Sequence, residues 1–116
     1  MKTICFDFDG VIHSYKSGWV AVDIIPDPPV EGIKDTLAAI RHSQDKPKIV
    51  IHSTRCSTPK GITAIWRWLI EWDLALFIDD VVGTKPPAVI YIDDRGYHFD
   101  GNTIDLTNKI LEILKK

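Results

Sequence analysis

Short apolar runs alternate along the chain with segments in which apolar residues recur every three or four positions. The runs at residues 2–8, 48–52, 77–82 and 89–92 predict four buried strands. Helical spacing predicts helices at residues 29–42, in the Trp-bearing segment that follows Thr58, and at about 106–114. Strands that alternate with helices are typical of an α/β domain with a mainly parallel sheet.

The pattern is less regular between these elements. Residues 11–30 contain three prolines and predict an irregular segment, whose residues 14–28 we call the flap, with a small hairpin between 19–22 and 11–12. Residues 97–99 are expected to form a last edge strand. The three tryptophans at positions 66, 68 and 72 could stack on nucleic-acid bases, but their helical spacing favours core packing.

The chain length supports one domain over residues 1–116, because 116 residues leave no room for a second one. The expected fold is a three-layer, Rossmann-like α/β domain with helices on both faces of the sheet. Residues 10–52 and 54–84 are needed for the flap, helices and strands, so no cap domain fits.

Charge, hydropathy and cysteine content limit the partners and the location that we expect for the protein. The formal net charge is −2, which gives no general attraction to nucleic acid. No apolar stretch is long enough to span a membrane, and a cytoplasmic location is expected. Cys5 and Cys56 follow no metal-binding spacing, and Cys5 is expected to be a small buried residue.

Chemically active side chains collect directly after the predicted strands. In parallel α/β sheets, ligands bind beyond the carboxyl ends of the strands, so these residues should share one edge. They are Asp7 and Asp9; Ser53, Thr54 and Arg55; Lys85; and Asp93 and Asp94. Clustered carboxylates repel one another unless a cation lies among them, and oxygen ligands favour Mg²⁺. Mg²⁺ and Lys85 would together attract a phosphoryl group.

This order of residues resembles the haloacid dehalogenase-like phosphohydrolase superfamily over essentially the whole chain. The matching motifs are Asp7-Phe8-Asp9-Gly10-Val11, the strand that ends in Ser53 with Arg55 two residues later, Lys85 followed by proline, and Asp93-Asp94 after an apolar strand. Each motif alone is weak. Their common order and their positions at strand ends make the resemblance specific.

The resemblance implies a role for each residue. Asp7 would be the nucleophile that forms an aspartyl-phosphate, and Asp9 the general acid and then the general base. Ser53 and Lys85 would complete the catalytic set and bind the phosphoryl group. The metal ligands would be Asp7, the backbone carbonyl of Asp9, and Asp94 in preference to Asp93.

Further substrate contacts are expected from Thr54, His13 and Arg55. His13 follows the first motif and could reach the leaving group. Arg55 could touch the substrate or pair with an acidic neighbour, and the sequence does not decide between these roles. His52 is expected to be a structural residue.

The expected function is therefore a capless, Mg²⁺-dependent phosphomonoester hydrolase acting on a small phosphorylated molecule. A nucleotide or polynucleotide-end phosphatase is the alternative enzyme. A receiver-like module, phosphorylated on Asp7 without turnover, is the alternative of another class, although receivers place their acidic pair before the lysine. No membrane partner is expected, and a homo-oligomer would be one way to cover the open site.

Overall fold

The computed structural model describes residues 1–93 and 99–115. Its elements in chain order are β1 (Thr3–Asp7), α1 (Ile33–Arg41), β2 (Lys48–His52), α2 (Pro59–Glu71), β3 (Asp80–Val82), β4 (Ile90–Ile92) and α3 (Thr103–Leu114), with 3₁₀ turns at Thr54–Ser57 and Ala75–Phe77. The predicted α/β class is confirmed, and the described residues include no cap domain.

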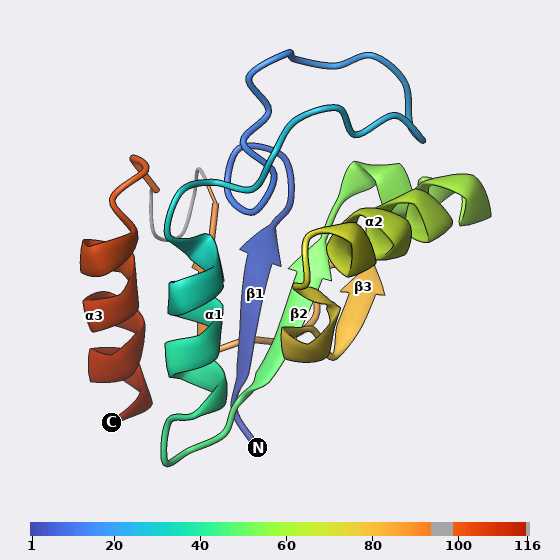
Figure 1. Ribbon diagram of the computed structural model, residues 1–116. Coiled ribbons are helices and arrows are strands. Elements are labelled where there is room, and N and C mark those ends of the chain that lie inside the picture. Colours follow the sequence, from blue (N-terminus) through green and yellow to red (C-terminus); the bar gives the residue numbers. More distant parts are fainter. Residues whose placement is uncertain (94–98, 116) are drawn as a thin grey trace.

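The four strands form one parallel sheet in the order β3-β2-β1-β4. The register places Phe6 beside Ile51 of β2 and Ile92 of β4. All carboxyl ends therefore point to the same edge, and the flap between β1 and α1 rises beyond that edge (Figure 1). The predicted convergence of strand ends is confirmed.

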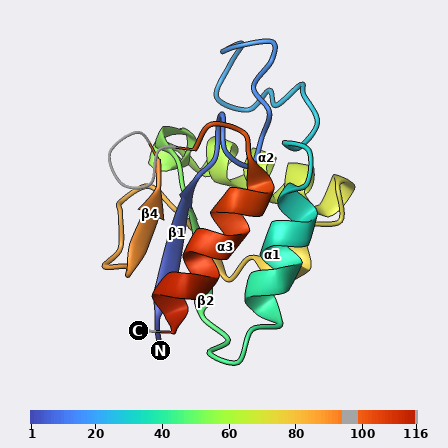
Figure 2. The same cartoon turned by 90° about the vertical axis from the view of Figure 1, so that its left-hand side faces the viewer.

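The main core lies between the sheet and the three helices. One sheet face contributes Ile4, Phe6, Ile49 and Ile51, which are buried in the same cluster as apolar residues of α1, α2 and α3. α1 lies directly against α3 (Figures 1 and 2). Within the described residues, all three helices therefore cover one side of the sheet.

The opposite sheet face is covered differently from the expected second layer of helices. Cys5 and Val50 alternate to this side and are buried. The connection at residues 83–89 passes on this side of the sheet (Figure 2), and the Tyr91 hydroxyl donates to the Pro86 carbonyl. This connection forms the third layer and contains no helix, which Pro86 and Pro87 disfavour.

Several element boundaries differ from their predictions. β3 is shorter than expected because the 3₁₀ turn at Ala75–Phe77 precedes it. α1 begins later than expected, after Gly32. α3 begins earlier than expected because Asn102 caps it. The predicted hairpin between 19–22 and 11–12 is wrong, since Ala21 bridges to Ile24 and His13 to Pro29. The predicted edge strand at 97–99 falls largely outside the described residues.

Apart from residues 94–98 and 116, the chain has no helix of the length and hydropathy needed to cross a bilayer.

Candidate active site

The end of β1 brings two carboxylates to the sheet edge. Asp7 is the last residue of the strand, and the chain then turns sharply at Gly10, whose φ is +85°. The carbonyl of Phe8 accepts hydrogen bonds from the N–H groups of residues 11, 12 and 13. This tight turn keeps Asp9 beside Asp7 before the chain enters the flap.

Most predicted site residues line one cavity of about 210 Å³ at the carboxyl ends of the strands. Its lining consists of Asp7, Phe8, Asp9, His52, Ser53, Thr54 and Lys85. Three separate segments of the chain therefore supply its polar groups. Asp94 lies outside the described residues, so its predicted metal contact stays a prediction.

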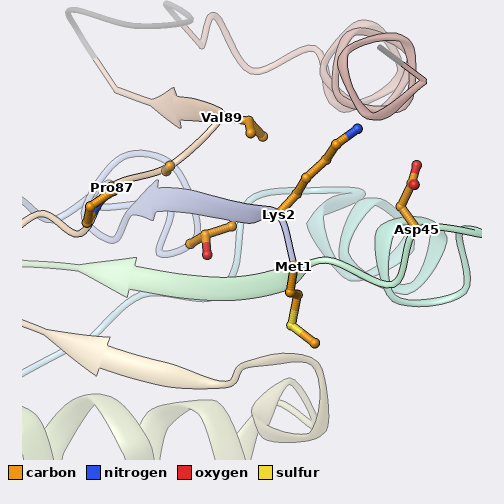
Figure 3. A pocket seen from close by; sticks show the side chains of 7 residues that line it. Met1, Lys2, Asp45, Pro87 and Val89 are labelled. Atoms are coloured by element: carbon orange, nitrogen blue, oxygen red, sulfur yellow. The ribbon is translucent and has the colours of Figure 1, made fainter.

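A larger hollow at the opposite edge of the sheet lacks this chemistry. Figure 3 shows its lining, which includes Met1, Lys2, Asp45, Pro87 and Val89. The Lys2 ammonium points toward α3 (Figure 3) and binds the Leu114 carbonyl at 2.6 Å. We therefore place the candidate active site at the smaller cavity.

Asp7 is the more accessible of the two carboxylates. Its side chain is 37% exposed, and its Oδ1 lies 3.5 Å from Nδ1 of His52. Partial burial, together with the negative charge of Asp93, raises the pKa of Asp7, although the contact with His52 and the charge of Lys85 oppose this. Because these surroundings disfavour the ionised Asp7 carboxylate, a bound cation would stabilise it.

Asp9 lies in the opposite electrostatic setting. Arg55 binds both of its oxygens, with Nε 3.0 Å from Oδ2 and Nη2 3.2 Å from Oδ1. Nδ1 of His13 is 2.8 Å from the same Oδ1. Burial by itself would raise the pKa of Asp9, but the hydrogen bonds of His13 and Arg55 and the charge of Arg55 lower it.

Ser53 and Lys85 offer hydrogen-bond donors to the cavity. The Ser53 hydroxyl accepts the Arg55 N–H at 3.1 Å and caps the 3₁₀ turn, so its own proton stays available for a ligand oxygen. Lys85 lines the same cavity, and its ammonium contacts Asp93 at 2.6 Å. This ion pair holds the lysine at the site, with a side chain that is still 40% exposed.

The structure places Arg55 and His13 behind the cavity and not in its lining. Both side chains are fully buried. Arg55 pairs with an acidic neighbour, which is one of the two roles that the sequence left open. Direct substrate contact by either residue stays a prediction that this conformation does not support.

The oxygen ligands are consistent with the expected Mg²⁺. Carboxylate and carbonyl oxygens at the end of β1 are hard ligands of the kind that Mg²⁺ prefers, and burial, with the charge of Asp93, raises the pKa of Asp7, whose anion a cation would stabilise. Asp7 and the Asp9 carbonyl would hold the ion on the described side of the site. Within residues 1–93 and 99–115, no three His, Cys, Asp or Glu side chains form a ready metal cluster.

Sequence reasoning missed the position of His52. The expectation of a purely structural residue is incomplete, because His52 lines the cavity and lies beside Asp7. The parallel register pairs Asp7 directly with His52, and side chains of paired positions project to the same face. Alignment of β1 with β2 is therefore the signal that could have identified His52 as a neighbour of Asp7.

Comparisons of the chain with protein-family models, curated proteins and solved structures found no match.

Proposed function

We propose that this protein is a Mg²⁺-dependent phosphomonoester hydrolase that works through an aspartyl-phosphate, as its resemblance to haloacid dehalogenase-like hydrolases implies. The observation that carries the proposal is the shared cavity of Asp7, Ser53, Thr54 and Lys85. It combines an accessible carboxylate nucleophile with hydroxyl and ammonium donors. A phosphoryl group needs these partners and little additional space.

The first half-reaction uses the exposed carboxylate of Asp7. One Asp7 oxygen attacks phosphorus, the bond from phosphorus to the leaving oxygen breaks, and that oxygen takes up a proton that Asp9 would donate in its protonated form. Bound Mg²⁺ would supply charge neutralisation to the phosphoryl oxygens. Ser53 and Lys85 donate hydrogen bonds to those oxygens and orient the group for in-line attack.

The second half-reaction releases phosphate from Asp7. A water molecule attacks phosphorus, the bond to the Asp7 oxygen breaks, and the water gives up a proton. Asp9 would accept that proton as a carboxylate; its lowered pKa keeps it ionised at neutral pH, although it also makes Asp9 a weaker base. For the first step, Asp9 would need a proton that these surroundings do not favour.

Turnover of p-nitrophenyl phosphate tests the proposal. We expect multiple turnovers that EDTA abolishes and Mg²⁺ restores, and we expect Asp7→Asn to remove them while the fold is kept. A single phosphorylation of Asp7 without further product would instead identify the receiver-like module. A substantial rate in Asp7→Asn would overturn the assignment of the nucleophile.

A substrate panel then defines the leaving group. Sugar phosphates, nucleotides and 3′-phosphorylated oligonucleotides are compared at fixed Mg²⁺. A salt-sensitive preference for the oligonucleotide would favour the polynucleotide-end activity, because contacts to a phosphate backbone weaken with added salt.

A further inference from the structure

Three residues form a buried hydrogen-bonded unit behind the cavity, which we call the Asp9 clamp: Asp9, His13 and Arg55. The Asp9 carboxylate accepts from Nδ1 of His13 and from Nε and Nη2 of Arg55. The side chains of His13 and Arg55 are 0% exposed, and that of Asp9 is 21% exposed. Two fully buried polar side chains therefore bind one carboxylate at the cavity.

The contacts of His13 define which ring nitrogen carries the proton. The backbone N–H of Asp27 donates to Nε2 of His13 at 3.2 Å, so Nε2 acts as an acceptor. Nδ1 is then the protonated nitrogen of the neutral ring and donates to Asp9. The ring is held in this orientation by stacking on Phe8 and by edge contacts with Tyr15 and Trp68.

The same two side chains attach the flap to the site. Nη1 of Arg55 donates to the flap carbonyls of Ala21, Val22 and Ile24, at 2.7, 3.0 and 3.3 Å. The guanidinium also lies 4.5 Å from the ring centre of Trp19. His13 reaches the far end of the flap at Asp27.

Asp27 is itself held in place. It accepts two hydrogen bonds from Ser17, and its carbonyl accepts from the indole N–H of Trp68 on α2 at 2.9 Å. The flap, the helix layer and the Asp9 carboxylate thus belong to one connected network. A change in the flap position must alter the support of Asp9.

We propose that His13 and Arg55 are positioning residues that orient the Asp9 carboxylate for proton transfer and make its orientation depend on the placement of the flap. This inference rests on the proposed phosphatase function. It assigns His13 and Arg55 an action through Asp9 in place of direct contact with substrate. Misplacement of a catalytic group by about 1 Å can cost about 100-fold in rate, so loss of one clamp contact should affect turnover more than binding.

Two substitutions of His13 separate its two hydrogen bonds. In His13→Asn, the amide nitrogen occupies the place of Nδ1 and can still donate to Asp9. In His13→Gln, the amide group extends to the place of Nε2, keeps a partner for Asp27 and loses the donor to Asp9. His42→Gln is the control, because His42 is exposed at the end of α1.

Steady-state kinetics with p-nitrophenyl phosphate give the test. We expect kcat to fall about 10- to 100-fold in His13→Gln with little change in KM, and to stay within about 3-fold of wild type in His13→Asn. Thermal unfolding of both variants is measured in parallel, since a purely structural role would lower kcat and stability together in both. His42→Gln should match the wild-type protein.

Equal activity of the two His13 variants, whether both high or both low, overturns the positioning role. The same holds for a loss confined to KM. If the wild-type protein turns over no phosphomonoester, the proposed function is wrong. The wild-type assay shows this before any variant is compared, so the two failures are distinguishable. If His13→Gln does not fold, Arg55→Lys supplies the same readout, because a lysine cannot reproduce the two-oxygen contact with Asp9.

Discussion

At the residue scale, Asp7 and Asp9 show how one strand end produces two chemically different carboxylates. Both line the same cavity, as the sequence predicted. Partial burial and the charge of Asp93 raise the pKa of Asp7, whereas the hydrogen bonds of His13 and Arg55 lower the pKa of Asp9. Divergent surroundings of paired carboxylates are typical of divided catalytic roles, and they support the proposed roles of Asp7 as nucleophile and Asp9 in proton transfer.

The raised pKa of Asp7 predicts a cost in stability. Because its pKa is higher in the folded state than in the unfolded chain, the ionised side chain destabilises the fold above the unfolded value of about 3.9. Asp7→Asn should therefore unfold at a higher temperature than wild type at pH 7 without Mg²⁺. The advantage should shrink as the pH falls toward 4. Thermal unfolding across this pH range checks the trend, and an advantage independent of pH would contradict it.

Arg55 supports a second prediction at this scale. Arg55→Met keeps most of the side-chain volume but leaves Asp9 without its main partner and removes the donors to three flap carbonyls. Removal of one partner of a buried ion pair costs about 3–5 kcal/mol, so the free energy of unfolding should fall by about that amount. Arg67→Met, on the exposed side of α2, is the matched control and should change it by less than about 0.5 kcal/mol. Urea unfolding measures both, and equal losses would show that the pair contributes nothing specific.

At the scale of elements, local signals predicted β2 and the start of α2 well and the start of β3 poorly. α2 begins as expected because Thr58 accepts the Gly61 N–H and Pro59 occupies the first helical position. The apolar run at 77–82 gave no sign that Ala75–Phe77 would form a 3₁₀ turn. Arg41 of α1 binds the Phe77 carbonyl at 2.7 Å, and such a distant contact is invisible to local periodicity.

Gly61 allows the start of α2 to pack closely against the 3₁₀ turn that contains Arg55. A Cβ added at this residue would overlap the backbone carbonyl of Arg55, so the start of α2 and the 3₁₀ turn can pack together only around glycine. Within an ordinary helix, Gly→Ala stabilises by about 1 kcal/mol. Gly61→Ala should instead destabilise by about 1–3 kcal/mol and loosen the clamp. Urea unfolding and phosphatase kinetics measure the two effects, and a gain in stability would rule out the close packing.

At the scale of the whole molecule, topology explains which part of the site was predictable. Parallel strands bring their carboxyl ends to one edge, so the order of strands and polar residues along the chain is enough to group Asp7, Ser53 and Lys85. The pairing of Arg55 with Asp9, 46 positions apart, depends on how the flap folds back, and no periodic pattern encodes that path. The flap, which the sequence predicts only as an irregular region, holds the Arg55 side chain that binds Asp9.

Mg²⁺ should stabilise the whole domain through the site at the end of β1. A ligand that binds only the folded state adds a free energy of RT ln(1 + [L]/Kd), which is about 2.7 kcal/mol at 100 times Kd. Because the charge at Asp7 is what the cation would offset, the unfolding temperature at pH 7 should rise with Mg²⁺ concentration in wild type and much less in Asp7→Asn. Asp45→Asn, at the opposite edge of the sheet, should respond as wild type does. An equal rise in wild type and Asp7→Asn would place the bound ion elsewhere on the protein and remove the metal from the proposed mechanism.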